Sequence, residues 1–154
     1  MSDNQIKETD SRKEISKKIL ESKKRWNAVI NNLTYRLKND NIQDIYNVQA
    51  ESINYRQEVV DEVHIYAIKI HKLVYKMKTL SKSKFEFYAT SYPVKTSGSE
   101  KLKLIDYDMG EYQQFINELD DFVNFLRDTS KNLEAINYSV KGRVELNNIL
   151  SGYK

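Results

Sequence analysis

The chain has 154 residues with one proline, four glycines and no cysteine, so it has the length of one ordinary domain and few turn signals. The lack of cysteine excludes disulfides and thiolate metal sites, and apolar runs of only a few residues exclude a membrane span. The N-terminus has no apolar signal core, so a soluble intracellular protein is expected.

Apolar residues recur mostly at helical spacing, which predicts an all-α protein built from long, two-sided helices. The net charge of +3 is unevenly distributed: residues 1–90 hold 17 basic and 12 acidic side chains (+5), whereas residues 91–154 hold 8 and 10 (−2). Basic side chains concentrate in residues 12–25 and 69–84. Such runs are usually solvated helix faces, so charge alone identifies no partner.

The first predicted helix spans residues 12–38, after a disordered segment expected over residues 1–10. Ser11 and Glu14 have the spacing of a capping box, which predicts the helix start. The short polar residues 39–41 compete for backbone hydrogen bonds and predict a hairpin, with a continuous helix as the alternative. The apolar side of this helix consists of Ile15, Ile19, Trp26, Ile30, Leu33 and Leu37.

The second predicted helix spans residues 42–89 and carries a heptad seam, in which apolar residues alternate at spacings of 4 and 3. Such a seam packs against a partner helix. Two consecutive steps of four, around Val59, make a stutter that locally relaxes the supercoil. The seam consists of Ile45, Val48, Ser52, Tyr55, Val59, Val63, Tyr66, Ile70, Leu73, Met77 and Leu80.

Residues 90–107 are predicted to form a loop, because Pro93 cannot continue a helix and residues 97–99 are rich in serine and glycine. Asp108 and Glu111 form another capping-box spacing, which predicts the last helix over residues 108–151. Its seam consists of Tyr112, Phe115, Leu119, Phe122, Leu126, Thr129, Leu133, Ile136 and Val140. We therefore predict a single helical domain over residues 11–154. In it, two long coiled-coil-like helices form an antiparallel hairpin with a shorter N-terminal helix.

The last seam also supplies candidate contacts between copies of the chain. One short chain of three helices has difficulty covering both long seams, and assembly into a helical homo-oligomer would cover them. The alternative is an intramolecular core. The candidate oligomerisation residues are Phe115, Leu119, Phe122, Leu126, Leu133, Ile136 and Val140.

No catalytic residue, metal ligand or cofactor site is predicted. The four glycines are isolated, which excludes a glycine-rich phosphate loop. His64 and His71 lie seven residues apart, roughly 10.5 Å along a helix, too far to share one metal ion. Asp120 and Asp121 point about 100° apart on a helix, so they cannot act as an acid–base pair on one substrate. A non-enzymatic role is expected.

A run of six lysines from Lys69 to Lys84, uninterrupted by any acid, ends at a cluster of aromatic residues. Single-stranded DNA is bound by cations that follow its phosphates and by rings on which its bases stack. Lys78 and Lys82 fall on the far side of the helix from the stripe that contains Lys69 and Lys76. The alternative is that the rings are core and the lysines solvated. The DNA-binding candidates are Lys76, Lys78, Lys82, Lys84, Phe87 and Tyr88.

The heptapeptide at residues 82–88, KSKFEFY, resembles a motif of the UvsY recombination mediators of T-even-type tailed phages. In that family a basic pair precedes an acidic residue and adjacent rings at the end of the long helix. A variable loop follows, as at residues 91–99, and then an apolar cluster similar to residues 119–125. The tail from Tyr138 to Gly152 is also similar, and the order and spacing of these motifs extend the resemblance over residues 44–152.

The chain departs from the family pattern in three places. Residues 89–91, ATS, replace the glycine that follows the adjacent rings, and Ile136-Asn137 replaces a basic and a small residue before the tail aromatic. The segment before Trp26 is also longer than the family leads one to expect. The role of the first helix therefore stays open.

The resemblance implies a mediator that binds single-stranded DNA in the cytoplasm of an infected bacterial host. Members form ring-like helical oligomers, so a hexamer or heptamer is implied, and help a RecA-like recombinase replace single-strand binding protein. The resemblance places Lys82 and Lys84 at phosphates, with Phe87 and Tyr88 stacking or supporting. Two other classes stay open: a structural or scaffolding coiled-coil phage protein without a DNA-binding role, and an adaptor for an acidic protein.

Overall fold

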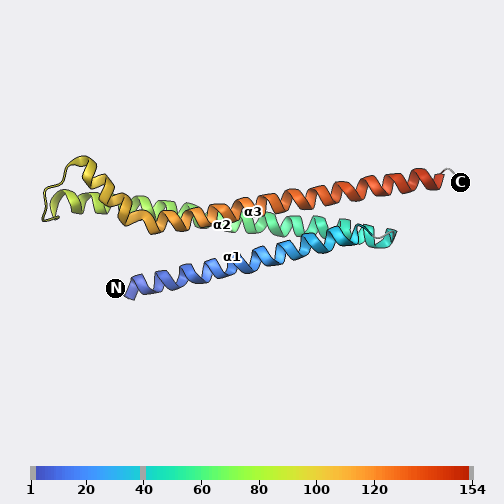
Figure 1. Ribbon diagram of the computed structural model, residues 1–154, viewed down its shortest axis with the longest axis horizontal. Helices are drawn as coiled ribbons and strands as arrows, with labels where there is room; N and C mark the ends of the chain where they lie inside the picture. The colour runs from blue at the N-terminus through green and yellow to red at the C-terminus, as the bar shows by residue number, and fades with distance from the viewer. Residues whose placement is uncertain (1–2, 39–40, 153–154) are drawn as a thin grey trace. The chain divides into compact units, whose positions relative to one another are not determined.

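A computed structural model describes residues 3–38 and 41–152, and residues 1–2, 39–40 and 153–154 lie outside the description. It contains the helices α1 (Asp3–Arg36), α2 (Ile42–Thr90) and α3 (Gly98–Gly152), shown in Figure 1. The described residues include no strand, which confirms the all-α prediction. Over their described residues, none of the three helices has an apolar stretch of the length that crossing a bilayer requires.

The helix α1 begins at Asp3, earlier than the start predicted at Arg12. The segment over residues 1–10, predicted to be disordered, is therefore helical from Asp3 onward. Ser11 and Glu14 lie inside the continuous helix, where the backbone amides already have intrahelical partners. The capping-box spacing therefore did not mark a helix start here.

The helix α1 ends at Arg36 and α2 begins at Ile42, on either side of the short polar residues 39–41, of which residues 39–40 lie outside the described part. Asn41 caps α2, because its Oδ1 accepts hydrogen bonds from the backbone amides of Gln43 at 3.0 Å and Asp44 at 3.3 Å. Across the turn, the Arg36 guanidinium lies 2.6 Å from Asp44 Oδ1 and 2.8 Å from Glu51 Oε2. These hydrogen bonds raise the pKa of Arg36 and lower that of Asp44. The interruption confirms two helices in place of one continuous helix.

The helix α3 begins at Gly98, so the predicted loop over residues 90–107 is wrong in its second half. A capping box at Ser97 starts the helix: the Ser97 amide donates to Glu100 Oε2 at 2.7 Å, and the Glu100 amide donates to Ser97 Oγ at 3.3 Å. The hydrogen bond from the Ser97 amide also lowers the pKa of Glu100. Asp108, the predicted start, lies within α3.

The chain divides into two compact units, whereas the sequence favoured one helical domain. The first, here called the three-helix unit, comprises α1, α2 up to Val63 and α3 from Asn124 onward. The second, here called the hairpin unit, comprises His64–Val123, in which the end of α2 and the beginning of α3 run antiparallel across a short loop (Figure 1).

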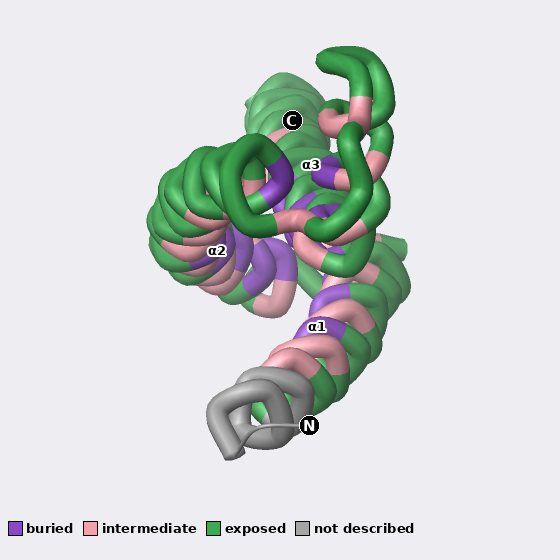
Figure 2. The backbone as a smooth tube through the Cα atoms, turned by 90° about the vertical axis from the view of Figure 1, so that its left-hand side faces the viewer, coloured by how far each residue is buried: buried purple, intermediate pink, exposed green. Residues whose placement is uncertain are grey.

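The three-helix unit is held together by the predicted seams. The indole Nε1 of Trp26 donates to Glu62 Oε2 at 2.8 Å, and its ring meets Tyr55 edge-on at 6.1 Å. The polar seam residues Ser52 and Thr129 are buried and donate to the carbonyl oxygens of Gln49 and Phe125 within their own helices, so neither hydroxyl is left unsatisfied. Buried residues recur along each helix, as Figure 2 shows in purple. This core contains Ile19, Trp26, Leu33, Ile45, Val48, Val59, Leu126, Leu133, Ile136 and Val140.

The hairpin unit has a thinner core, because only two helices cover each other. Tyr66 meets Phe122 edge-on with ring centroids 4.8 Å apart, and Tyr88 packs with Ile105 and Met109 near the loop. Several seam residues of α2 are only half-buried here: Val63, Ile70, Leu73, Met77 and Leu80. The seam therefore faces its partner helix as predicted but is not sealed from solvent.

The residues predicted to join copies of the chain lie in the intramolecular core. Each of the seven is buried, because the α3 seam packs against the other helices of its own unit. In this conformation they form an intramolecular core, the alternative that the sequence left open, and contacts between copies through these residues stay a prediction. The residues concerned are Phe115, Leu119, Phe122, Leu126, Leu133, Ile136 and Val140.

Candidate nucleic-acid interface

The end of α2 is tied to α3 through one carboxylate. Asp108 Oδ2 accepts a hydrogen bond from the Tyr88 hydroxyl at 2.8 Å and lies 3.0 Å from Lys84 Nζ. Burial by itself raises the pKa of Asp108, but the two donors outweigh it and hold the pKa below its ordinary value. The hydrogen bond that the Tyr88 hydroxyl donates to Asp108 also raises the pKa of Tyr88. Lys84 and Tyr88 occupy successive inward positions after Leu80, so the seam continues through this network.

Tyr88 is one of the predicted stacking residues, and the structure does not allow that role. Its side chain is 9% exposed, packed on Ile105 and Met109, and its ring meets Tyr92 edge-on at 5.0 Å. A base has no open ring face on which to stack. Stacking by Tyr88 is therefore excluded in this conformation, and a supporting role for its ring is what the geometry leaves.

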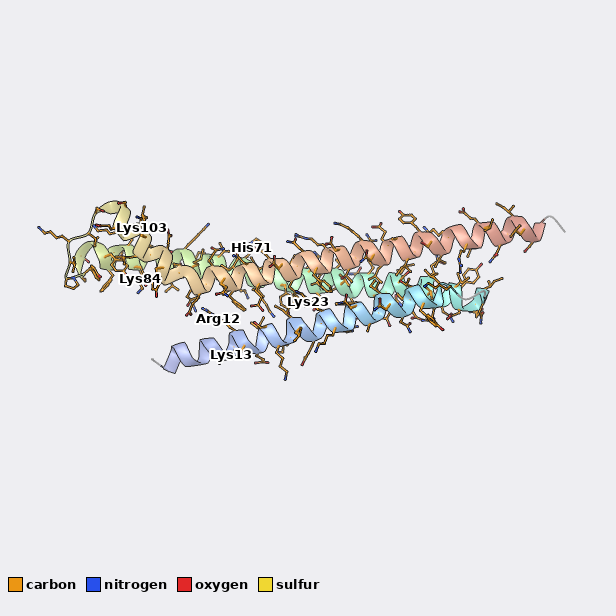
Figure 3. All side chains as sticks on the ribbon, viewed as in Figure 1. Arg12, Lys13, Lys23, His71, Lys84 and Lys103 are labelled. Carbon is orange, nitrogen blue, oxygen red and sulfur yellow. The ribbon has the colours of Figure 1, made fainter. Side chains whose placement is uncertain are left out.

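Lys84 is similarly engaged within the chain. Its ammonium is paired with Asp108, and its side chain is 43% exposed. Figure 3 labels Lys84 near the end of the hairpin unit, and Lys103 on α3 in the same unit. A phosphate reaching Lys84 would have to share or replace Asp108, which weakens Lys84 as a direct contact.

The opposite side of α2 carries a second set of residues at spacings of 4 and 3, all exposed. These residues, here called the outer stripe of α2, are His71, Tyr75, Lys78, Lys82 and Phe85. At about 100° per residue they fall within roughly 80° of the helix circumference and extend about 21 Å along it.

The outer stripe of α2 places two cations between two open rings. Tyr75 is 75% exposed and Phe85 is 47% exposed, on either side of Lys78 and Lys82 along the helix. The stripe contains no acidic residue, and Glu86 borders it one turn after Lys82. The alternative that Phe85 and Phe87 belong to the core is wrong, since both are exposed.

Other lysines of the basic run cover rings of their own chain. The Lys69 ammonium lies 4.5 Å from the Tyr66 ring centroid, and the Lys76 ammonium lies 5.6 Å from that of Tyr112. Such cation–π contacts stabilise packing by about 0.5–1 kcal/mol at exposed sites. The structure therefore separates Lys76 from Lys78 and Lys82, which it brings together with Tyr75 and Phe85.

Histidine and acidic side chains are the residue types that could hold a metal ion in the part of the chain that the structure describes. Among the residues described, no group of three or more His, Asp or Glu side chains is arranged to hold a metal ion. His64 and His71 are both exposed on α2, and Figure 3 labels His71.

Sequence reasoning missed His71, Tyr75 and Phe85 as members of a common surface. Their signal is present in the sequence as a second 4–3 alternation, offset from the seam by about half the helix circumference.

Comparison with known proteins adds no further assignment: no protein-family model, curated protein or solved structure matches this chain.

Proposed function

We propose that this chain binds single-stranded DNA through the outer stripe of α2 and acts as a non-enzymatic recombination mediator. The observation that carries the DNA-binding part is the placement of Lys78 and Lys82 between the open rings of Tyr75 and Phe85 on one face. The mediator part is supported by the resemblance of residues 82–88 and of the tail to the UvsY family.

Single-stranded DNA is the form that this face fits. Lysines neutralise phosphates of any nucleic acid, but a ring gains about 1–3 kcal/mol per base only where the base is unstacked. In a duplex the faces of the bases are covered by their neighbours, so Tyr75 and Phe85 would add nothing there. The stripe therefore favours a flexible single strand lying along α2.

The network of Lys84, Tyr88 and Asp108 has a supporting role in this proposal. It fixes the last turns of α2 against α3, so that Lys82 and Phe85 are presented on a rigid helix. In a homo-oligomer, each copy would contribute its own stripe. A strand bound to the stripes of several copies would be kept extended. Such an extended strand is a favourable substrate for a RecA-like recombinase displacing single-strand binding protein.

The DNA-binding proposal is tested by measuring affinity for an oligo-dT strand and for a duplex of equal length over a salt series. Each lost phosphate contact lowers the slope of log K against log salt by about 0.7, so a Lys78→Ala/Lys82→Ala variant loses about 1.4. A matched variant, Lys131→Ala, removes an exposed lysine paired with Asp128 in the three-helix unit and keeps the slope. An unchanged slope in the double variant would remove the stripe as the site.

The mediator role needs a separate measurement. With strands first covered by single-strand binding protein, wild-type chain is expected to shorten the lag before a RecA-like recombinase hydrolyses ATP on the DNA. The Lys78→Ala/Lys82→Ala variant is expected to leave the lag as long as without added chain. A structural coiled-coil protein would assemble normally, show no preference for single strands and leave the lag unaffected in both forms.

A further inference from the structure

Six basic side chains of α1 fall into an inward and an outward set of three each. Residues 11–36 contain eight basic and two acidic side chains, a balance of +6. The inward set makes contacts within the three-helix unit. The Lys23 ammonium, labelled in Figure 3, lies 5.7 Å from the Phe125 ring centroid. Arg25 pairs with Glu58, and Arg36 pairs with Asp44 and Glu51. These cations are accounted for by the fold.

The outward set consists of Lys13, Lys17 and Lys24, all exposed. At about 100° per residue, they fall within roughly 40° of the circumference of α1 and extend about 16 Å along it. Tyr35, 67% exposed, continues the same face toward the end of the helix. We call these four residues the outer stripe of α1.

The two acids of this segment leave the outer stripe of α1 positive. Glu14 lies off the stripe and pairs with Lys18 at 2.7 Å, and the hydrogen bond from Lys18 lowers the pKa of Glu14. Glu21 lies 4.0 Å from Lys17, with both side chains more than half exposed, a pair of little strength in water. The inward cations therefore take part in the packing of the three-helix unit, whereas this packing does not explain why Lys13, Lys17 and Lys24 share one face.

We propose that the outer stripe of α1 is a second surface that binds the phosphates of single-stranded DNA; this inference rests on the proposed function. Like the outer stripe of α2, it combines exposed lysines with an exposed tyrosine ring on one face of a helix. A membrane surface would require a broad apolar face, whereas among residues 11–36, whose side chains the structure describes, Leu20 is the one large, exposed aliphatic side chain near these lysines. An acidic protein would need the cations and make no use of the ring.

The consequence is that each chain holds a strand at two places, one in each unit. A strand long enough to reach both stripes would bind the second one as an intramolecular partner, so long strands are expected to bind more tightly than short ones. All of α1 precedes residues 44–152, which carry the family resemblance, so the resemblance does not account for this surface.

The test uses the full-length chain with Lys13→Ala/Lys17→Ala/Lys24→Ala, short and long oligo-dT strands, and a salt series. Loss of three contacts lowers the slope of log K against log salt by about 2. The advantage of the long strand over the short one is also expected to fall. Arginine at the same three positions keeps the charge and is expected to restore both.

The matched control removes three exposed lysines from other faces, Lys18, Lys131 and Lys141. This control is expected to keep the slope and the advantage of the long strand. Circular dichroism checks that each variant keeps its helix content, which is expected because none of the outward lysines is buried.

The outcomes separate this inference from the proposed function. If the α1 variant binds like the control while Lys78→Ala/Lys82→Ala binds weakly, the outer stripe of α1 is not a DNA site and the proposed function stands. If wild type fails to prefer single strands, both are wrong. Loss of binding to phosphatidylserine vesicles, with DNA binding retained in the α1 variant, would overturn the inference in favour of a membrane contact.

Discussion

Two tyrosines of the hairpin unit are expected to respond in opposite ways to mutation. Tyr88 is buried and donates to Asp108 at 2.8 Å, whereas Tyr75 is 75% exposed on the outer stripe of α2. We expect Tyr88→Phe to lower stability with little effect on DNA affinity, because the Lys84–Asp108 pair still holds the end of α2 against α3. We expect Tyr75→Ala to lower DNA affinity without changing stability.

The magnitude for Tyr88→Phe follows from the hydrogen bond that is lost. A bond to a charged acceptor contributes about 1.5–3 kcal/mol. Asp108 keeps Lys84 at 3.0 Å, and its side chain is 22% exposed, so water replaces part of the lost bond. A decrease of about 1–1.5 kcal/mol in the free energy of unfolding is expected, or about 2–6 °C in Tm.

The magnitude for Tyr75→Ala follows from stacking alone. Loss of one base–ring contact costs about 1–3 kcal/mol, which weakens oligo-dT binding about 5- to 150-fold. Urea denaturation followed by circular dichroism measures stability, and fluorescence anisotropy with labelled oligo-dT measures affinity. If Tyr88→Phe leaves stability unchanged, or Tyr75→Ala leaves affinity unchanged, the assignment of the two rings is refuted.

Three further predictions concern the helix ends. Arg36→Ala leaves Asp44 and Glu51 without their shared partner and is expected to lower the free energy of unfolding by about 1–3 kcal/mol. Urea denaturation measures this loss, and an unchanged midpoint would contradict a stabilising role for the two ion pairs of Arg36. Because the folded pKa of Asp44 is depressed, this stabilisation is present above the unfolded value near 3.9 and is lost as pH falls through the lower folded value. The difference between wild type and Arg36→Ala is therefore expected to shrink in an acid titration; a constant difference would argue against the ion pair. Ser97→Ala removes the acceptor for the Glu100 amide and is expected to cost about 1 kcal/mol, seen as faster amide exchange in the first turn of α3; unchanged exchange would exclude the capping box as the helix start.

The helical architecture could be predicted because its signal is local. Residues such as Val59, Leu126 and Leu133 recur at the helical period, and each is buried where the seam placed it. The start of α3 could not be predicted from residue type alone. Serine and glycine at residues 97–99 indicate a loop, whereas the spacing from Ser97 to Glu100 indicates a capping box. In the structure the capping box forms and the helix begins at Gly98.

The candidate site could be predicted only in part, because burial of adjacent rings depends on helix phase and on the partner helix. Phe87 and Tyr88 are neighbours in sequence, yet only Tyr88 is buried, since it faces α3 and finds Asp108 there. Likewise Lys84 and Lys82 have the same chemistry, but only Lys84 meets a carboxylate. These distinctions arise from contacts between segments distant in sequence.

The position of the bound strand tests the central claim most directly. Wild-type chain is crosslinked by light to oligo-dT carrying 5-iodouracil, and the modified residues are identified by mass spectrometry. Crosslinks are expected at Tyr75 and Phe85 of the outer stripe of α2. Tyr107 of α3, 86% exposed in the same unit, is an internal control for random contact. Crosslinks that are confined to Tyr107, or absent from Tyr75 and Phe85, would contradict the account.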